Sequence, residues 1–265
     1  MAWLDFLRSA LFLGISYVSI VLYIPVLIVG WLLPRRRRYY VLFSYGFVVF
    51  WLARIITGLR WEVEGREHLQ GPPGRLIAAK HQSTWDTMIL PVLLHQPAFV
   101  LKKELLWIPI FGTGLAGMGP IAIDRKAGRQ ALKQILTQGK VALAEGRDVV
   151  IFPEGTRHRP DVVAEYKPGV ALLAREAKTP IIPVALNSGC FWRKKQFLKR
   201  PGTIRLVIGS PIPTEGKRPE QITREVRDWI ETEQRRLYQQ YGCPGAPDAA
   251  RIHTESGSGA AVGKP

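Results

Sequence analysis

Cysteine is scarce in this sequence of 265 residues, which contains only Cys190 and Cys243. No CxxC pair or other metal-ligand spacing accompanies them, so a structural zinc site is not indicated. The low count is typical of a reducing compartment, where disulfides rarely persist. We therefore expect Cys190 to be a small buried residue and Cys243 to be a free thiol in a C-terminal tail.

Acidic residues are also few, with 21 Asp and Glu against 37 Lys and Arg, which leaves a formal net charge of +16. A basic excess of this size indicates an anionic partner, either a nucleic acid or an anionic membrane. Two motifs of common enzyme classes are missing: the phosphate-binding loop GxxxxGK[ST] and the nucleophile elbow GxSxG. The sequence therefore lacks the signatures of a P-loop nucleotide-binding protein and of an α/β-hydrolase.

Long hydrophobic runs are confined to the N-terminus. Residues 10–33 are almost entirely apolar, and at about 1.5 Å per residue they are long enough to cross a hydrocarbon layer of about 30 Å. Four arginines, Arg35 to Arg38, separate them from a second apolar run at residues 39–59. No small-residue cleavage site follows the first run, which argues against a signal peptide. We expect residues 1–59 to form a two-helix membrane anchor.

The four arginines favour the cytoplasmic side of a membrane. Two arrangements of the anchor keep the rest of the chain on that side. In one, the two runs form a hairpin that dips into a single leaflet, with Pro25 breaking the first helix. In the other, the first helix spans the membrane and the second lies in the interface, with the Arg54 side chain reaching the surface.

Residues 60–242 have the composition of a globular domain. Residues 60–64 alternate like an edge strand, and further segments that indicate strands cover residues 76–80, 98–101, 120–123, 148–152, 180–186 and 203–208. Helical patterns cover residues 86–95, 102–107, 127–145, 168–177 and 219–241, and the glycine-rich segment 112–119 is expected to be a loop. The alternation predicts an α/β fold with a mainly parallel sheet flanked by helices. Residues 243–265 are expected to be a disordered tail.

His81 and Asp86 follow the expected strand at residues 76–80. A separation of five brings them together only if His81 lies in the turn and Asp86 in the first helical turn. Asp86 would then accept from one imidazole nitrogen, and the other nitrogen would be left as a base near neutral pH. Taken alone, the pair also fits a surface histidine and an aspartate favoured by the helix dipole.

Three cations, Lys102, Arg125 and Arg157, follow other expected strands. Ligands of parallel sheets bind at the carboxyl ends of strands, so these side chains are expected to share one edge with His81. Arginine binds phosphate through a planar fork and lysine binds it as a point charge, while the turn at Gly155 offers backbone N–H groups to an anion. Each cation alone fits an ordinary surface charge, but a base beside three of them predicts a hydroxyl-bearing phosphate substrate.

The order of these segments resembles the glycerolipid acyltransferases, specifically the bacterial type that acts on 1-acyl-sn-glycerol-3-phosphate. The resemblance covers about residues 60–215. The matching blocks are HQSTWD at 81–86, KKEL at 102–105 with Pro109 and Phe111-Gly112, GPIAIDR at 119–125, FPEGTR at 152–157 and IIPV at 181–184. One departure is Ala122, where the family often has a larger residue. A lone HxxxxD is a weak signal, but HxxxxD followed in this order by EGTR is a specific one.

The resemblance implies a glycerol-3-phosphate acyltransferase-like fold and direct acyl transfer without an acyl-enzyme. His81 would take the proton from the sn-2 hydroxyl of lysophosphatidic acid, and Asp86 would hold the imidazole. The hydroxyl oxygen would attack the thioester of acyl-CoA or acyl-ACP, a choice that the sequence leaves open. Neither a metal nor a cofactor is implied.

The family's remaining motif residues are implied to bind the acceptor. The implied phosphate-binding residues are Lys102, Arg125, Glu154, Gly155, Thr156 and Arg157. Because a carboxylate is an unusual phosphate ligand, we expect Glu154 to orient Arg157 or a backbone turn. Pro183 is expected to shape the pocket.

The implied setting is the bacterial inner membrane, with the catalytic domain on the cytoplasmic side and an acyl carrier protein as one possible donor. Basic and aromatic residues alternate between Phe191 and Arg200, and we expect this segment to contact an anionic membrane surface. Nucleic acid would also fit such a segment, but the apolar N-terminus argues against it. Two alternatives remain: an acyltransferase for another lysolipid, such as a lyso-ornithine lipid or a lysophospholipid, and a non-catalytic protein that binds anionic lipid.

Overall fold

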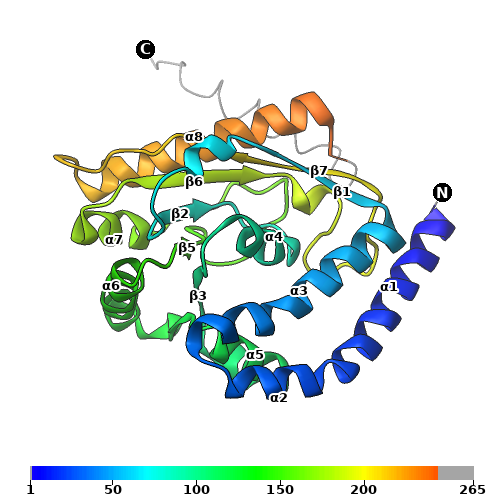
Figure 1. The fold of residues 1–265 in the computed structure, drawn as a ribbon. Coiled ribbons are helices and arrows are strands. Elements are labelled where there is room, and N and C mark those ends of the chain that lie inside the picture. Colours follow the sequence, from blue (N-terminus) through cyan, green and yellow to red (C-terminus); the bar gives the residue numbers. More distant parts are fainter. Residues whose placement is uncertain (1, 244–265) are drawn as a thin grey trace, which may run out of the picture.

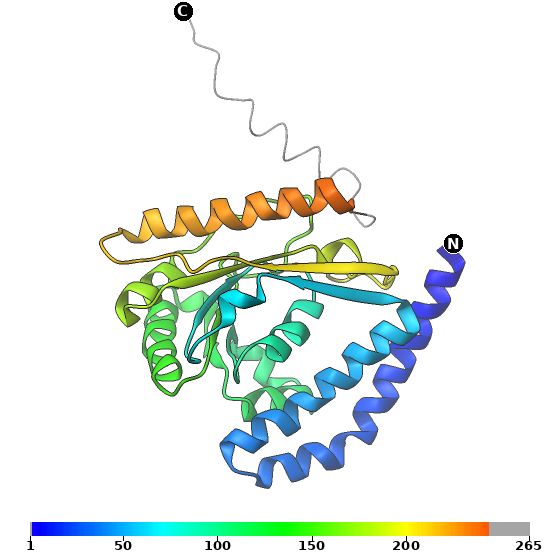
Figure 2. The ribbon, with the colours of Figure 1, turned by 45° about the horizontal axis from the view of Figure 1, so that its top comes forward.

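A seven-stranded mixed sheet forms the centre of the fold (Figures 1 and 2). The computed structural model describes residues 2–243, so the expected tail lies outside the described residues except for Cys243. The strands are β1 (Leu59–Glu64), β2 (Leu76–Ala79), β3 (Ala98–Lys102), β4 (Ile121–Ile123), β5 (Val149–Ile151), β6 (Ile181–Leu186) and β7 (Gly202–Ile208). Their spatial order is β1-β7-β6-β2-β5-β3-β4, and every adjacent pair is parallel except β6 and β7. The prediction of a mainly parallel sheet is confirmed.

The central strands are short and apolar because both of their faces are covered. All residues of β2 and β5 are buried, which is the pattern of a parallel strand between two helical layers. One face packs against α6 (Arg129–Ala144), α7 (Gly169–Ala177) and α8 (Pro219–Tyr241). The other packs against α4 (Trp85–Leu93) and the N-terminal helices. Short 3-10 turns connect several elements: η1 (Arg66–Leu69), η2 (Lys103–Trp107), η3 (Arg125–Ala127) and η4 (Ser188–Cys190).

The glycine-rich segment forms a helix, α5 (Phe111–Gly117), so the expectation of a loop at residues 112–119 is wrong. The glycines permit close packing. A Cβ on Gly112 would lie 2.3 Å from the carbonyl oxygen of Leu106, and one on Gly117 would lie 2.2 Å from the Leu42 side chain. These residues allow α5 to press against its neighbours instead of breaking the helix.

Three N-terminal helices replace the expected two: α1 (Ala2–Leu22), α2 (Ile24–Leu32) and α3 (Arg35–Thr57). The first apolar run breaks just before Pro25, which occupies the first turn of α2, where its missing N–H is tolerated. Pro34 then separates α2 from α3, and the four arginines form the first turn of α3. The helices α1 and α3 are long and apolar enough to cross a membrane.

The helix α3 joins these helices to the rest of the molecule (Figure 1). Phe50 and Ala53 are buried in the same apolar cluster as α4, and the Phe50 ring stacks on Trp85 with centroids 5.8 Å apart. Phe12 of α1 belongs to this cluster as well. The boundary that we expected after residue 59 is therefore a change in composition. In the structure, the helices before it and the domain after it pack together in one apolar cluster.

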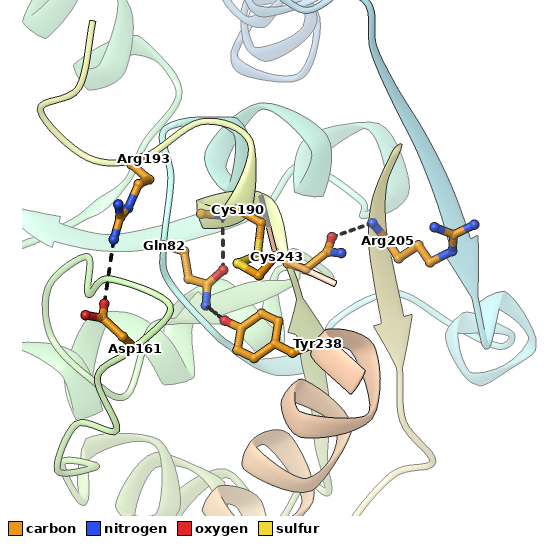
Figure 3. Close-up of a disulfide and its surroundings, with 9 residues drawn as sticks. Gln82, Asp161, Cys190, Arg193, Arg205, Tyr238 and Cys243 are labelled. Atoms are coloured by element: carbon orange, nitrogen blue, oxygen red, sulfur yellow. Dashed lines mark hydrogen bonds and ion pairs between the residues drawn. A yellow bond between two sulfur atoms is a disulfide. The ribbon is translucent and has the colours of Figure 1, made fainter. Parts of the chain in front are cut away.

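Cys190 and Cys243 form a disulfide between η4 and the end of α8 (Figure 3). Their Cα atoms lie 4.8 Å apart, within the range of disulfide geometry. Cys190 is buried as expected, but the expectation of a free thiol at Cys243 is wrong. The inference of a reducing compartment from the cysteine count loses its basis. The pairing depends on α8 returning to the end of β6, which the spacing of the cysteines in the sequence does not reveal.

Candidate active site

The carboxyl ends of four neighbouring strands lie along one edge of the sheet, because β2, β5, β3 and β4 are adjacent and parallel. His81 follows β2, Arg125 follows β4 and Arg157 follows β5, while Lys102 ends β3. The structure thus places the motif residues expected from the sequence along one edge. Segments after β6 add further residues that the sequence analysis did not include.

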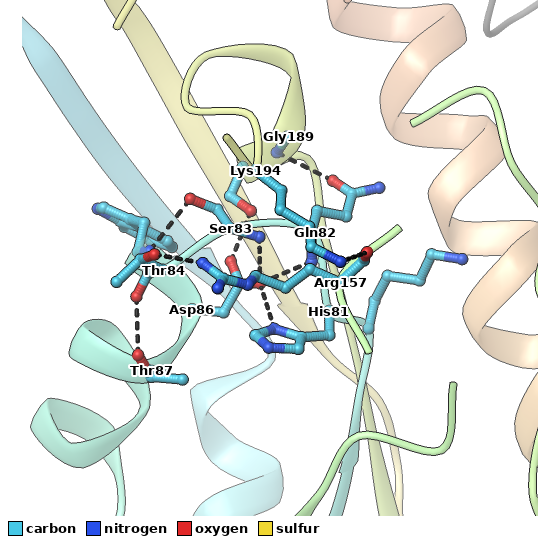
Figure 4. Close-up of polar contacts among 12 residues, drawn as sticks. His81, Gln82, Ser83, Thr84, Asp86, Thr87, Arg157, Gly189 and Lys194 are labelled. Atoms are coloured by element: carbon cyan, nitrogen blue, oxygen red, sulfur yellow. Dashed lines mark hydrogen bonds and ion pairs between the residues drawn. The ribbon is translucent and has the colours of Figure 1, made fainter. Parts of the chain in front are cut away.

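Asp86 is a buried carboxylate in the first turn of α4, with hydrogen-bond donors around it. It accepts from His81 Nδ1 at 3.0 Å, as Figure 4 shows. It also accepts from the backbone N–H groups of Gln82 and Ser83, both at 2.8 Å, and from the Ser188 hydroxyl at 2.5 Å. The helix N-terminus adds a favourable dipole. These donors hold the Asp86 carboxylate in place, and the carboxylate in turn fixes the imidazole of His81.

His81 is held in a single orientation. Because a carboxylate can only accept, Nδ1 carries the hydrogen that faces Asp86. The ring stacks on Phe152 with centroids 3.8 Å apart, and 14% of the side chain remains exposed. Nε2 forms no hydrogen bond with any residue between 2 and 243. The arrangement leaves one imidazole nitrogen without a partner among the described residues.

Glu154 does not face an anion. Its Oε2 accepts from the His81 backbone N–H at 2.7 Å, and its Oε1 lies 2.8 Å from the Lys80 ammonium. Of the two roles expected for it, the structure supports the orientation of a backbone turn, that of His81. Orientation of Arg157 and direct binding of phosphate are not supported.

Lys80 links the site to α8. Its ammonium lies between Glu154 and Glu231, 2.7 Å from the latter, and the Tyr166 hydroxyl also donates to Glu231 at 3.0 Å. Burial acts to lower the pKa of Lys80, but the two carboxylates outweigh it and raise the pKa above its usual range. A buried, protonated lysine therefore connects β2, the turn after β5 and α8.

The EGTR turn places its hydroxyl and guanidinium groups beside the His81 loop. Arg157 Nη1 donates to Thr84 Oγ1 at 2.5 Å (Figure 4). Thr156 Oγ1 accepts from the ammonium of Lys194 at 3.1 Å. Gly155 has φ of +71°, which favours glycine, but its N–H donates to Phe152 O at 2.9 Å. The Gly155 amide is therefore not free to bind an anion as expected.

Lys102 lies near a carboxylate with which it forms an ion pair, whereas Arg125 forms no ion pair with the described residues. The Lys102 ammonium is partly exposed and lies 3.4 Å from Glu104. Arg125 is exposed, and partial desolvation lowers the pKa of its guanidinium. Among residues 2–243, Arg125 has no hydrogen bond or ion pair. Arg125 and Arg157 are thus the better candidates for binding an anion.

Pro183 lies away from these groups. It is buried in β6, where its ring approaches Gly209 and Trp229 on the face that α8 covers. His81 stacks instead on Phe152, which packs against the cluster on the opposite face. The structure therefore does not support the pocket-shaping role expected for Pro183.

Two contributors to the site come from the segment after β6 and lie outside the motif blocks. Ser188 binds Asp86, and Lys194 binds the EGTR turn. No short motif marks them, because their role depends on the position of β6 next to β2. Within residues 2–243, no group of three or more His, Cys, Asp or Glu side chains is placed to hold a metal ion.

Comparison with known proteins agrees with the resemblance to acyltransferases that the sequence motifs indicate. A family model described as Acyltransferase matches residues 60–187. A 1-acyl-sn-glycerol-3-phosphate acyltransferase from Pseudomonas aeruginosa is 40% identical over 203 residues, which are 75% of this chain and 79% of that relative. The human 1-acyl-sn-glycerol-3-phosphate acyltransferase alpha is 30% identical over 171 residues, which are 64% of this chain and 60% of that relative.

A solved structure shares the fold. The crystal structure of the 1-acyl-sn-glycerophosphate (LPA) acyltransferase PlsC from Thermotoga maritima matches 88% of this chain and 95% of its own with a TM-score of 0.73, at 22% sequence identity. This likeness confirms the expected fold class. With 40% identity to a relative over most of both proteins, the chain belongs to the acyltransferase family.

Proposed function

We propose that this protein transfers an acyl chain from an acyl thioester to the sn-2 hydroxyl of 1-acyl-sn-glycerol-3-phosphate, which gives phosphatidic acid. The observation that carries the proposal is the His81–Asp86 pair at 3.0 Å, with Nε2 open at the sheet edge that also holds Arg125 and Arg157. The activity named for the relatives supports the choice of acceptor.

The chemistry follows from the geometry of the pair. Nε2 of His81 accepts the proton of the acceptor hydroxyl as its oxygen attacks the thioester carbonyl carbon. The new C–O bond forms, the C–S bond breaks, and the departing thiolate takes the proton from the imidazolium. Asp86 stabilises the imidazolium while it exists and keeps the hydrogen on Nδ1.

The acceptor phosphate binds beside the base in this proposal. Arg125 and Arg157 form no ion pair with a carboxylate of residues 2–243, so their charges are available to a phosphate. Lys102 assists as a point charge, and the Thr156 hydroxyl offers a hydrogen bond. The acyl donor is acyl-CoA or acyl-ACP, both of which are acidic and suit a chain with a net charge of +16.

The acceptor is a membrane lipid, and the N-terminal helices hold the site at its surface. Because Phe12 of α1 is buried in the same apolar cluster as Phe50 of α3 and Trp85 of α4, the first helix also faces protein on one side instead of lipid. This packing favours the arrangement in which the helices insert into one leaflet over the arrangement in which the first helix spans it. The catalytic domain then lies on the cytoplasmic side of the bacterial inner membrane, where its donors are made.

The test is acyl transfer by the purified protein in lipid vesicles, with a labelled acyl thioester and 1-acyl-glycerol-3-phosphate. The wild-type protein is expected to form phosphatidic acid, and His81→Ala is expected to lower the rate at least about 100-fold, the contribution typical of a general base. His95→Ala, at an exposed histidine, is the matched control. Retained activity in His81→Ala would contradict the mechanism. Acylation of a lyso-ornithine lipid in place of this acceptor would change the assigned substrate.

A further inference from the structure

Lys194 points toward the EGTR turn from the segment that connects β6 and β7 (Figure 4). Its ammonium donates to Thr156 Oγ1 at 3.1 Å and to the backbone carbonyl oxygen of Arg157 at 3.2 Å. An ammonium group has three N–H bonds, so one donor of Lys194 remains available at this position.

Lys194 differs from the basic residues next to it, although the sequence analysis assigned all three to one membrane-contacting surface. The Arg193 guanidinium lies 3.7 Å from the Asp161 carboxylate, and Lys195 is exposed. Lys194 is partly buried and turned toward the site. The three consecutive basic side chains therefore lie in three different environments.

The charges around Lys194 are mainly of the same sign. Burial, together with Arg157, Lys195 and Arg125, lowers the pKa of Lys194. Among residues 2–243, no carboxylate forms an ion pair with Lys194, Arg157 or Arg125. Cations that converge without a carboxylate between them repel one another, and a dianionic group bound among them would remove that repulsion.

The segment that carries Lys194 is fixed on both sides. The Lys199 backbone N–H donates to Ser9 Oγ of α1 at 2.9 Å, and the rings of Phe197 and Phe6 lie 5.0 Å apart. Lys194 is thus held between the helix expected to meet the membrane and the turn after β5. This is where the headgroup of a membrane-embedded acceptor has to lie if its hydroxyl is to reach His81.

We propose that Lys194 is a third cation of the acceptor-phosphate site, with Arg125 and Arg157, and that it donates its free N–H to a phosphate oxygen. The inference rests on the proposed function, because it names a ligand of the same acceptor. It assigns a specificity role to a residue outside the blocks that carry the family resemblance.

The test compares Lys194→Gln with Lys195→Gln, which removes the same charge from the next residue. Initial rates are measured in mixed micelles against the concentrations of 1-acyl-glycerol-3-phosphate and of the acyl thioester. Lys194→Gln is expected to raise the KM for the acceptor about tenfold, as for one charge-assisted hydrogen bond, with kcat and the donor KM within about threefold of wild type. Lys194→Arg is expected to recover most of the loss, and glycerol 3-phosphate is expected to inhibit Lys194→Gln more weakly than wild type.

An unchanged acceptor KM in Lys194→Gln, beside an active wild-type protein, would overturn the inference and leave the proposed function standing. Equal losses in Lys194→Gln and Lys195→Gln would also overturn it, since they would reflect the charge of the surface. A wild-type protein that forms no phosphatidic acid would overturn the proposed function itself, and the inference with it.

Discussion

Asp86 shows how much of the local structure serves one side chain. Its carboxylate accepts from three groups of the His81 loop that precedes it and from Ser188, which is 102 residues away in the chain. A buried ion is costly unless its hydrogen-bonding capacity is filled, and here the donors fill it. The buried carboxylate is therefore held in a fixed position and keeps the His81 ring in place.

Ser188 should behave as a positioning residue. Ser188→Ala removes a hydrogen bond to an ionised group, worth about 1.5–3 kcal/mol, so kcat is expected to fall about tenfold or more while the acceptor KM changes little. Ser188→Thr, which keeps the hydroxyl, should restore most of the rate. Ser83→Ala is the matched control, because the Ser83 hydroxyl accepts from the Trp85 backbone and does not touch Asp86. A wild-type kcat in Ser188→Ala would show that this bond does not orient the pair.

Glu154 illustrates the limit of assigning a role from residue type and position. The sequence correctly located it in the turn after β5, beside Arg157. Its carboxylate nevertheless turns toward Lys80 and the His81 backbone. A carboxylate among cations was an unlikely phosphate ligand on electrostatic grounds, but only the structure identified its partners.

At the scale of elements, α8 contributes to the site from the far side of the sheet. Glu231 of α8 pairs with Lys80 at the end of β2, and Tyr238 of α8 accepts from Gln82 at 2.5 Å. The disulfide closes the end of the same helix against η4. These contacts tie a helix without a catalytic motif to both sides of the His81 loop.

Lys80→Met tests this connection. It leaves two buried carboxylates without their cation, so the free energy of unfolding is expected to fall by about 3–5 kcal/mol. Burial raises the pKa of Glu154, and Lys80 opposes that rise. In the folded variant, Glu154 should therefore hold a proton that the unfolded state releases above about pH 4.5. The variant's stability should therefore decrease as the pH rises from about 5 to 8.

Urea unfolding at both ends of that pH range measures the effect. Lys140→Met is the control, because its ion pair with Glu176 is exposed and should contribute no more than about 1 kcal/mol. A loss of stability in Lys80→Met as small as in the control would mean that the buried cluster does not hold α8 in place. An equal loss at both pH values would contradict the proton uptake.

At the scale of the whole molecule, the N-terminal helices form one flank of the protein (Figure 2), and many of their exposed residues are apolar. The exposed apolar residues of α1 include Trp3, Leu7, Leu11, Val18 and Leu22. Exposed apolar surface of this extent marks an interaction site, and the net charge of +16 suits an anionic membrane.

Arginine at two of these positions tests the membrane contact. Val18 is 62% exposed and Leu22 is 74% exposed, so the double variant Val18→Arg, Leu22→Arg should fold normally. Its binding to vesicles that contain phosphatidylglycerol is expected to fall at least about tenfold, although the variant carries two additional positive charges. Co-sedimentation with vesicles measures it, and Gln239→Arg on the exposed side of α8 is the control. Unchanged or tighter binding would show that charge, and not apolar insertion, holds the protein at the membrane.

The sequence by itself determined most helices and strands, and also the edge of the sheet at which the candidate site lies. Periodicity and proline placed α8 at residues 219–241, as the structure has it, while alternation marked β1 and short segments rich in apolar residues marked the other strands. Because parallel strands end at one edge, the positions of His81, Lys102, Arg125 and Arg157 followed from local patterns alone. These features depend on neighbours within a few residues, which a sequence contains directly.

Only the tertiary structure decided which groups meet across long separations. The pairing of Cys190 with Cys243, the contact of Ser188 with Asp86 and the inward turn of Lys194 all depend on how β6 and α8 return to β2. The reason for the glycines in α5 is likewise visible only in the structure, where Leu42 and Leu106 pack closely against them. Such contacts are set by packing between distant segments, and local patterns contain no information about packing.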